Sequence, residues 1–504
     1  MFTAIILISK KHDILTFGTR HLPGFSLRIY SAISTQQAKK LDNEAQTMIQ
    51  TTSLKQKAIQ LMHILFPILV SQIALSAITF FDTNMSGKFG TADLAGVAIG
   101  TSLWIPIQTG LSGILIGITP IVSHLMGSRK EKEVAYQVMQ GLWLSLIVSI
   151  LVLLIGFIAL SPILDFMNLE VAVRDIAFRF LGAISFGVIP LFGYTVLRSC
   201  IDALGQTRVS MFITLIALPV NVGLNYLLIY GHFGFPRLGG VGAGVASAIT
   251  YWVIFAIALL FIYRSEPFVS LQLFRKFYSI SLRSFKDLLK IGVPIGFSIF
   301  FETAVFSAVT LLMSRFDTMT IAAHQAAINF ASTLYMIPLS ICMSLTILVG
   351  YETGSGRLKD ARQYGIMGIG LAAVLSLATA LVLFFAGDHV AGLYSDDPNV
   401  VSLIQHFLIY AIFFQISDAI ATPTQGVLRG YKDVVPAFVI CFAAYWVVGL
   451  PTGYLLATYT DLEAYGYWIG LITGLAIGAI LLMSRLVKVQ RRYAAKYVEG
   501  QLQT

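Results

Sequence analysis

The sequence is poor in charge. Of its 504 residues only 12% are Asp, Glu, Lys or Arg, whereas 57% are hydrophobic. A soluble protein carries about a quarter of its residues as charged side chains. Half of that charge cannot cover the surface of a soluble globule of this length, so most of the chain must face something other than water. This shortage excludes a cytosolic enzyme.

Reactive and nucleotide-binding patterns are scarce too. The three cysteines, Cys200, Cys342 and Cys441, lie far apart and lack any metal-ligand or paired spacing, so we interpret them as packing residues. No GxxxxGK[ST] stretch is present, so the chain has no P-loop with which to hydrolyse ATP. No Ser, His and Asp set suggests covalent chemistry. We therefore expect neither an enzyme nor a bound organic cofactor.

Long hydrophobic runs dominate instead. A helix needs about 20 mostly apolar residues to cross a bilayer. Twelve such runs occur, near 60–86, 95–126, 137–160, 176–200, 209–230, 241–263, 289–313, 321–350, 365–386, 401–428, 434–458 and 466–487. The sequence predicts an all-α integral membrane protein with twelve transmembrane helices.

Basic residues mark one side of this predicted membrane protein. The connections that follow the even-numbered spans, together with the tail, hold most of the Lys and Arg, whereas 387–400 and 459–465 hold none. Cytoplasmic loops carry such an excess. We expect a multi-pass protein of the cell membrane with both termini in the cytoplasm. The net charge of +9 is then a loop property, and nucleic-acid binding is not expected.

The two halves of the chain resemble each other at an offset of 227 to 231 residues. Gly127-Ser128 aligns with Gly354-Ser355, and Val196-Leu197-Arg198 aligns with Val427-Leu428-Arg429. Six spans per half is an even number, so both halves enter the membrane from the same side and form two parallel six-helix bundles. Secondary transporters place a site between such repeats and rock one against the other. We expect an extension at 1–54, an N-lobe at 55–263, a linker at 264–288, a C-lobe at 289–487 and a cytoplasmic tail at 488–504.

Three acids interrupt the apolar spans. Asp82 lies in the outer part of the first span, Glu302 at the centre of the seventh and Asp418 near the middle of the tenth. An ionisable group at such depth is costly and marks a functional site by default. None has an Arg or Lys at helical spacing to neutralise it. We expect all three to take part in cation coupling, by loading and releasing a proton or Na⁺, with a protonated structural carboxyl as the alternative.

The first half offers amides rather than a second central acid. Asn221 and Asn225 are four residues apart and so share a helix face. With Asp82 they would form an oxygen-rich first-lobe pocket. The alternative is that this pair of amides holds neighbouring helices together.

Several stretches resemble the multidrug and toxic compound extrusion (MATE) transporters of the NorM-like branch. They include FFDTNMSG, ADLAGVAIGTSLW, IGVPIGFSIFFE, AAHQAAINFASTLYMIPLSI, QISDAI and LRGYKD, and the similarity extends over roughly 55–490. The resemblance implies the two-lobed MATE fold and an antiporter that exchanges Na⁺ or H⁺ for organic cations, expected to act as a monomer.

The resemblance also implies roles for individual residues. Glu302 and Asp418 match the second-lobe cation site, with Na⁺ as a candidate ion, and Asp82, Asn221 and Asn225 match first-lobe coupling positions. Phe414 stands where many relatives carry Tyr, so a hydroxyl is lost there. The substrate-binding positions that we expect from the resemblance and from cavity chemistry are Asp396, Asp397, Phe301, Phe414 and Met336. A solvated cap of the tenth span is the alternative for the Asp396 and Asp397 pair.

Efflux of lipophilic organic cations is therefore the expected function. A flippase for lipid-linked oligosaccharides, as in distant relatives of the same fold, and a membrane scaffold without transport are the alternatives. A flippase for an anionic pyrophosphate should line its cavity with Arg and Lys, yet the predicted spans hold few basic residues, of which Arg198 is one.

Overall fold

The computed structural model describes residue 48 and the ranges 50–167, 169–274, 278–395 and 397–502. Of the predicted extension at 1–54, positions 1–47 and 49 lie outside the described residues. The first described helix, α3, begins at Leu54. Its N-cap Ser53 and Gln56 form a reciprocal capping box, which satisfies backbone N–H groups of the first turn.

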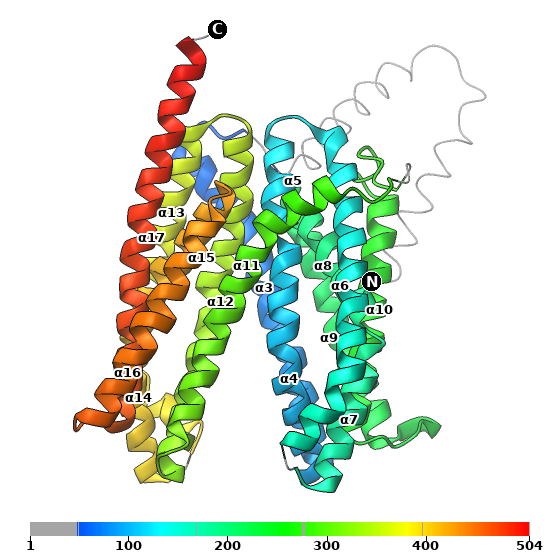
Figure 1. Cartoon of the computed structure of the whole chain (residues 1–504), viewed down its shortest axis with the longest axis vertical. Helices are drawn as coiled ribbons and strands as arrows, with labels where there is room; N and C mark the ends of the chain where they lie inside the picture. The colour runs from blue at the N-terminus through cyan, green and yellow to red at the C-terminus, as the bar shows by residue number, and fades with distance from the viewer. Residues whose placement is uncertain (1–47, 49, 168, 275–277, 396, 503–504) are drawn as a thin grey trace, which may run out of the picture. The chain divides into compact units, whose positions relative to one another are not determined.

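Helices account for nearly all of the described chain (Figure 1). The first set comprises α3 (Leu54–Phe89), α4 (Thr91–Ile116), α5 (Ile118–Gly127), α6 (Glu131–Phe166), α7 (Val171–Ser185), α8 (Val188–Ala203), α9 (Thr207–Tyr230), the short η1 (His232–Gly234) and α10 (Gly240–Arg264). The second comprises α11 (Leu282–Met313), α12 (Thr318–Gly354), α13 (Leu358–Gly392), α14 (Pro398–Gly430), α15 (Val434–Phe442), the π-helical η2 (Ala443–Gly449), α16 (Leu450–Tyr459) and α17 (Glu463–Leu502).

The number of membrane spans agrees with the prediction from hydropathy. Eleven helical segments in the described chain are long and apolar enough to cross a membrane, and a twelfth is the pair α7 and α8, which is bent by 50°. Gly187 lies at this bend, where a Cβ would come within 2.8 Å of Ala248 Cα in α10. The bend therefore lets the fourth span pack closely on the sixth, which hydropathy alone does not reveal.

Two helix ends differ from the predicted boundaries. Helix α11 begins at Leu282, inside the predicted linker, where the Ser281 side chain accepts a hydrogen bond from the Ser284 backbone N–H. Helix α17 continues to Leu502, well past the predicted end of the last span. The turns just beyond the predicted span contain Lys488, Arg491 and Arg492, so the hydrophobic signal ends although the helix does not.

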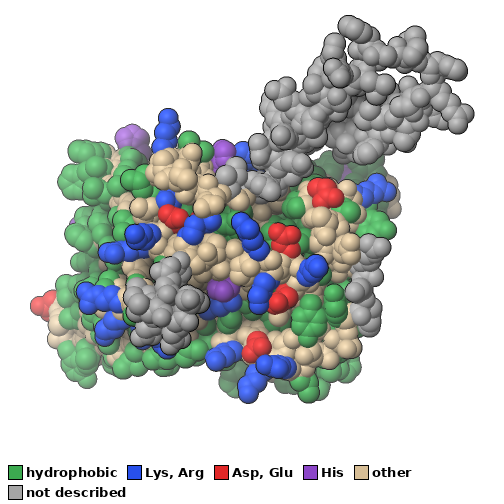
Figure 2. Space-filling model, turned by 90° about the horizontal axis from the view of Figure 1, so that it is seen from above, with side chains coloured by type: hydrophobic (Ala, Val, Ile, Leu, Met, Phe, Trp, Pro, Cys, Tyr) green, Lys and Arg blue, Asp and Glu red, His purple; other side chains and the backbone are tan. Residues whose placement is uncertain are grey.

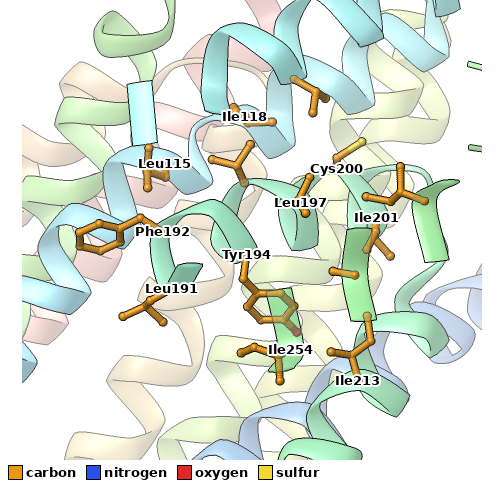
Figure 3. Packing of buried hydrophobic residues seen from close by; sticks show 14 of the residues in the cluster. Leu115, Ile118, Leu191, Phe192, Tyr194, Leu197, Cys200, Ile201, Ile213 and Ile254 are labelled. Carbon is orange, nitrogen blue, oxygen red and sulfur yellow. The ribbon is translucent and has the colours of Figure 1, made fainter. Parts of the chain in front are cut away.

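Each set of helices packs as a bundle around its own core. In the first, α3 packs on α9, and α10 packs on α7 and α9. Figure 3 shows buried side chains of this core, with Leu115 and Ile118 meeting Phe192 and Leu197 of α8. In the second, α14 is central and packs on α12, α13 and α17. We call these bundles the N-lobe (α3–α10) and the C-lobe (α11–α17).

Candidate functional site

Asp82 accepts hydrogen bonds from two helices of the N-lobe. Its Oδ1 accepts from Asn225 Nδ2 of α9 at 2.6 Å, and its Oδ2 accepts from Ser247 Oγ of α10 at 2.9 Å. Asn225 Nδ2 also donates to Asn221 Oδ1 at 3.0 Å. Both Asn side chains are fully buried. The structure thus brings Asp82, Asn221 and Asn225 together in one pocket.

Ser247 belongs to this pocket and was missed in the sequence. It comes after the glycine-rich stretch 239–244. Gly242 of that stretch lies against the backbone of α9, where a Cβ would be 2.7 Å from Leu228 O. This close approach of α10 to α9 places Ser247 near Asp82. A lone Ser gives no signal of its own in an apolar span.

Glu302 and Asp418 lie within electrostatic interaction range of each other in the C-lobe. Glu302 of α11 is partly exposed, and its Oε1 accepts a hydrogen bond from Tyr335 Oη at 3.4 Å. Asp418 of α14 is only 1% exposed. Its Oδ1 accepts from Thr422 Oγ1 at 2.7 Å, whereas its Oδ2 has no hydrogen-bond partner. One carboxylate oxygen at this buried position is therefore available.

A basic residue that is not at helical spacing in the sequence interacts with Glu302 in the structure. Arg429, at the end of α14, is only 8% exposed and interacts electrostatically with Glu302. Arg429 Nη2 donates to Gln425 Oε1 at 3.3 Å, and the Gln425 side chain faces Glu302. In the sequence, Arg429 is the first basic residue after a predicted span and is therefore predicted to lie in a loop. In the structure its long side chain turns back along α14 into the lobe.

Aromatic side chains lie on the same helices as the acids. Phe301 belongs to a cluster with rings of α15 and η2, with its centroid 4.8 Å from that of Phe442. Phe414 is buried, and its ring packs edge-on against Phe306 at 5.5 Å between centroids. Met336 is partly buried in α12, next to Tyr335.

Of the acidic pair before α14, the structure describes only the second residue. Asp396 lies outside the described residues. Asp397 is exposed and caps α14, since its Oδ1 accepts a hydrogen bond from the Asn399 backbone N–H at 2.9 Å. This is the capping arrangement considered as the alternative from the sequence.

Glycines allow the two lobes to touch at their backbones. A Cβ on Gly113 of α4 would lie 2.7 Å from Gly296 Cα of α11, and one on Gly117 would lie 2.7 Å from Gly292 Cα. The repeat pair Gly127 and Gly354 packs in the same way, each against the backbone at the end of the other lobe's helix. These contacts bring the backbones of α4 and α5 close to those of α11 and α12.

The interlobe glycines lie towards one end of the bundle, which we call the basic end. It is formed by the loops at 128–130, 204–206, 265–274, 278–281, 355–357 and 431–433. Figure 2 looks onto this end and shows Lys and Arg side chains gathered across it, with fewer Asp and Glu.

A charged clasp joins the lobes at the basic end. Lys57 of α3 is buried, and its Nζ donates to Asp360 Oδ1 at 2.7 Å and to Gln363 Oε1 at 2.6 Å, both at the start of α13. Tyr364 Oη donates to Gln60 Oε1 at 2.9 Å and bonds Thr51 Oγ1 at 3.1 Å.

A neutral clasp occupies the repeat-related position. Tyr136 of α6 precedes Tyr364 by 228 residues, within the offset of the internal repeat. Its Oη bonds Ser284 Oγ of α11 at 2.8 Å. Gln140 donates from Nε2 to Ser279 O at 2.7 Å and accepts from Ser281 N at 2.9 Å. The two clasps and the glycine contacts hold the lobes together at the basic end.

Comparisons with known proteins give the same picture. The model of the family called MatE matches the chain twice, over residues 67–227 and 294–455, a spacing equal to the repeat offset. A probable multidrug resistance protein NorM from Bacillus cereus is 57% identical over 446 residues, which cover 88% of this chain and 98% of that protein. The probable NorM protein of Bacillus subtilis is 55% identical over 449 residues, 89% of this chain and 99% of that protein.

Solved structures match the fold. A multidrug resistance MATE family transporter of the MOP superfamily in an outward-facing conformation superposes with a TM-score of 0.79 at 17% identity, covering 86% of this chain and 95% of that one. The eukaryotic MATE transporter AtDTX14 superposes with a TM-score of 0.76 at 21% identity, covering 88% of this chain and 99% of that one.

Proposed function

The chain belongs to the MATE family of cation-coupled multidrug efflux transporters, and we propose that it exports lipophilic organic cations from the cell in exchange for Na⁺ or H⁺. It is a multi-pass membrane transporter and not an enzyme. We propose further that Glu302 and Asp418 form the main coupling site and that the protein acts as a monomer.

The observation that carries the second-lobe site is the free oxygen of Asp418. Asp418 Oδ2 is buried without a hydrogen-bond partner, and Glu302 interacts with the same carboxyl. A buried carboxylate is costly unless a charge or a hydrogen bond compensates it. A proton or Na⁺ at this oxygen would provide that compensation.

The local charges suggest how many cations the site holds. With both acids ionised, Glu302, Asp418 and Arg429 together carry one negative charge. A single Na⁺ or H⁺ neutralises it. An organic cation that approaches the partly exposed Glu302 competes with the coupling ion for this negative charge. If both cations were bound, one positive charge would be left uncompensated in a low-dielectric site. Release of the coupling ion and capture of the drug then exclude each other, as exchange requires.

Substrate contacts would come from the rings beside the acids. Aromatic faces attract organic cations, and Met adapts its shape to varied ligands. We propose that Phe301, Phe414 and Met336 line the path of the drug. Asp397 would add negative charge at the opposite end from the clasps while capping α14.

We propose that the N-lobe pocket assists coupling. Asp82 already accepts hydrogen bonds from Asn225 and Ser247, so its oxygens are better satisfied than those of Asp418. Loss of its charge should therefore impair transport less than loss of either second-lobe acid.

A flippase for anionic lipid-linked sugars fits the C-lobe less well. Such a substrate needs free cationic side chains. Arg198 lies 3.5 Å from Asp202 Oδ2, and Arg429 is engaged by Gln425 and Glu302. A scaffold without transport would not need the buried acids.

The test is gradient-driven efflux of a fluorescent organic cation from membrane vesicles. Glu302→Gln and Asp418→Asn keep the side-chain volume and remove the charge, so both should reach the membrane at normal levels and lose efflux. Asp461→Asn, at an exposed loop position, is the matched control and should transport normally. Efflux at the unmutated rate by both core variants would move the coupling site to Asp82, Asn221 and Asn225. Separate Na⁺ and pH gradients identify the ion.

A further inference from the structure

The C-lobe holds a second buried polar atom beside the unpartnered oxygen of Asp418. Tyr445 Oη of η2 makes no hydrogen bond of normal geometry, although Tyr445 is only 2% exposed. Its polar neighbours are the Cys441 thiol, Glu302, Asp418 and the Tyr335 hydroxyl. A buried polar group without a partner costs about 1–3 kcal/mol. Tyr445 and Asp418 interact electrostatically, and each has an oxygen without a partner, which calls for an explanation such as a bound ligand.

The backbone around Tyr445 departs from a regular α-helix. Residues Ala443–Gly449 form a π-helical turn within the eleventh span. Such turns widen a helix locally, shift the phase of the residues around them and often occur at functional sites. The result is that Tyr445 turns inward to the acids, while Val447, two residues on, is 62% exposed.

Two contacts hold this turn against the acids. Trp446 Nε1 donates to Phe301 O at 2.9 Å, which fixes η2 to α11 one residue before Glu302. On the other side, the ring of Tyr445 lies over Gly478 of α17, where a Cβ would be 3.3 Å from Tyr445 Cε1. The glycine leaves room for the ring of Tyr445 at this contact.

Resting on the function proposed above, we infer that Tyr445 is a ligand-supplying residue of the second-lobe cation site, whose hydroxyl oxygen binds the coupling cation together with Asp418 Oδ2 and Glu302. Oxygen atoms are the ligands that hard cations such as Na⁺ prefer, and a neutral hydroxyl adds one without adding charge. The single negative charge of the cluster is unchanged.

The surroundings of Phe414 support this assignment. Phe414 has no hydroxyl, and its ring is buried between Phe306 and Trp468. It therefore gives no oxygen to the cluster from α14. The eleventh span provides one from the other side instead, through Tyr445.

Tyr445→Phe is the direct test, because it removes one oxygen and keeps the ring. Tyr459→Phe is its matched control, since Tyr459 ends the same span and is 77% exposed. The readout is the melting temperature of the purified full chain. It is measured first as NaCl progressively replaces N-methylglucamine chloride at constant ionic strength, and then as the pH is lowered without Na⁺. The midpoints give the cation affinity without requiring transport.

Tyr445→Phe should raise the half-saturating Na⁺ concentration about tenfold, since a partner worth about 1.4 kcal/mol changes affinity by that factor. If H⁺ is the ion, the midpoint should shift to lower pH by about one unit. Tyr459→Phe should change neither. Unchanged midpoints for Tyr445→Phe, with Asp418→Asn abolishing the response, would overturn the role of Tyr445 alone. No response to either cation in the unmutated chain would overturn the coupling site itself.

A second variant covers the case in which Tyr445→Phe does not fold. Gly478→Ala leaves the hydroxyl in place and pushes the ring by a few tenths of an ångström, because its Cβ would meet Tyr445 at 3.3 Å. Cation affinity should fall two- to fivefold. Gly370→Ala, in α13, has nothing within 4 Å of its Cβ and is the control. An unchanged midpoint in Gly478→Ala would contradict the proposal.

Discussion

Lys57 and Asp360 connect the N-lobe to the C-lobe through an ion pair of 2.7 Å, although the Lys57 side chain is only 3% exposed. Arg357 lies 3.6 Å from the same carboxylate and 2.6 Å from Glu352, so the pair is part of a small charge network. A buried ammonium is stable only with such partners. In a state that opens at the basic end these partners must separate and be hydrated.

Lys57→Gln should favour opening at the basic end. The variant loses the ion pair but leaves Asp360 with Arg357, so we expect a cost of about 1–2 kcal/mol to the closed state, or a five- to thirtyfold shift in the ratio of closed to open protein. Labelling of a Cys introduced at Ser123, which is fully buried in α5, should become faster. Lys55→Gln, two residues earlier and exposed, is the control. An equal labelling rate in Lys57→Gln and Lys55→Gln would show that the clasp does not hold this end closed.

Gly296→Val should prevent the lobes from closing at the basic end. A Cβ at Gly296 would lie 2.6 Å from both Gly110 O and Ile114 Cγ1 of the other lobe. Backbone cannot yield as a side-chain tip does, so overpacking of about 1–3 kcal/mol should oppose the closed state. Efflux should fall while membrane insertion persists. Gly387→Val, with open space at its Cβ, should transport normally, and equal efflux from the two variants would argue against the contact.

Ser247→Ala should weaken the N-lobe pocket without emptying it. The variant removes one hydrogen bond to Asp82, worth about 1 kcal/mol, and keeps that from Asn225. The loss of efflux should be several times smaller than in Glu302→Gln when the initial rates of both variants are measured under the same gradient. A loss as complete as in Glu302→Gln would place Asp82 at the centre of coupling.

Orientation can be tested with single cysteines, since the three native ones are buried. If the basic end faces the cytoplasm, Cys at Lys130 should resist an impermeant thiol reagent applied to intact cells, and Cys at Asn399 should react. Both positions are exposed at opposite ends of the helices. The reverse labelling pattern would invert the proposed topology.

Two shortened chains should behave differently. A chain that starts at Met48 keeps Thr51, which bonds Tyr364, and the Ser53 cap of α3. It should insert and transport like the full chain. A chain that starts at Leu54 lacks both the cap and the Thr51 contact, so its free energy of unfolding should fall by about 1–2 kcal/mol. Thermal unfolding of the two purified proteins measures the difference, and impaired transport from Met48 onward would show that the extension matters.

Much of the fold follows from the sequence because the bilayer demands long apolar helices. All twelve spans, the two-lobed repeat and the pairing of Asp82 with Asn221 and Asn225 could be anticipated in this way. Helical spacing puts the two amides on one face, and the repeat places the lobes in parallel.

The remaining features depend on contacts between helices that are distant in sequence. Arg429 stands at a span end in the sequence, but its flexible side chain reaches Gln425 and Glu302. Tyr445 escapes any argument from α-helical spacing, since the π-helical turn shifts its phase. Ser247 and Lys57 gain meaning only from partners 165 and 303 residues away.

The close packing of Gly127 on the Tyr351 backbone and of Gly354 on the His124 backbone also bears on the speed of the cycle. Interlocking side chains would have to change rotamers before the lobes could part. At these two positions backbone meets backbone, so separating them requires no change of rotamer. The activation barrier is then governed by the few polar bonds of the clasps, so turnover can be adjusted by changing single hydrogen bonds at the rim while the packing of each lobe stays rigid.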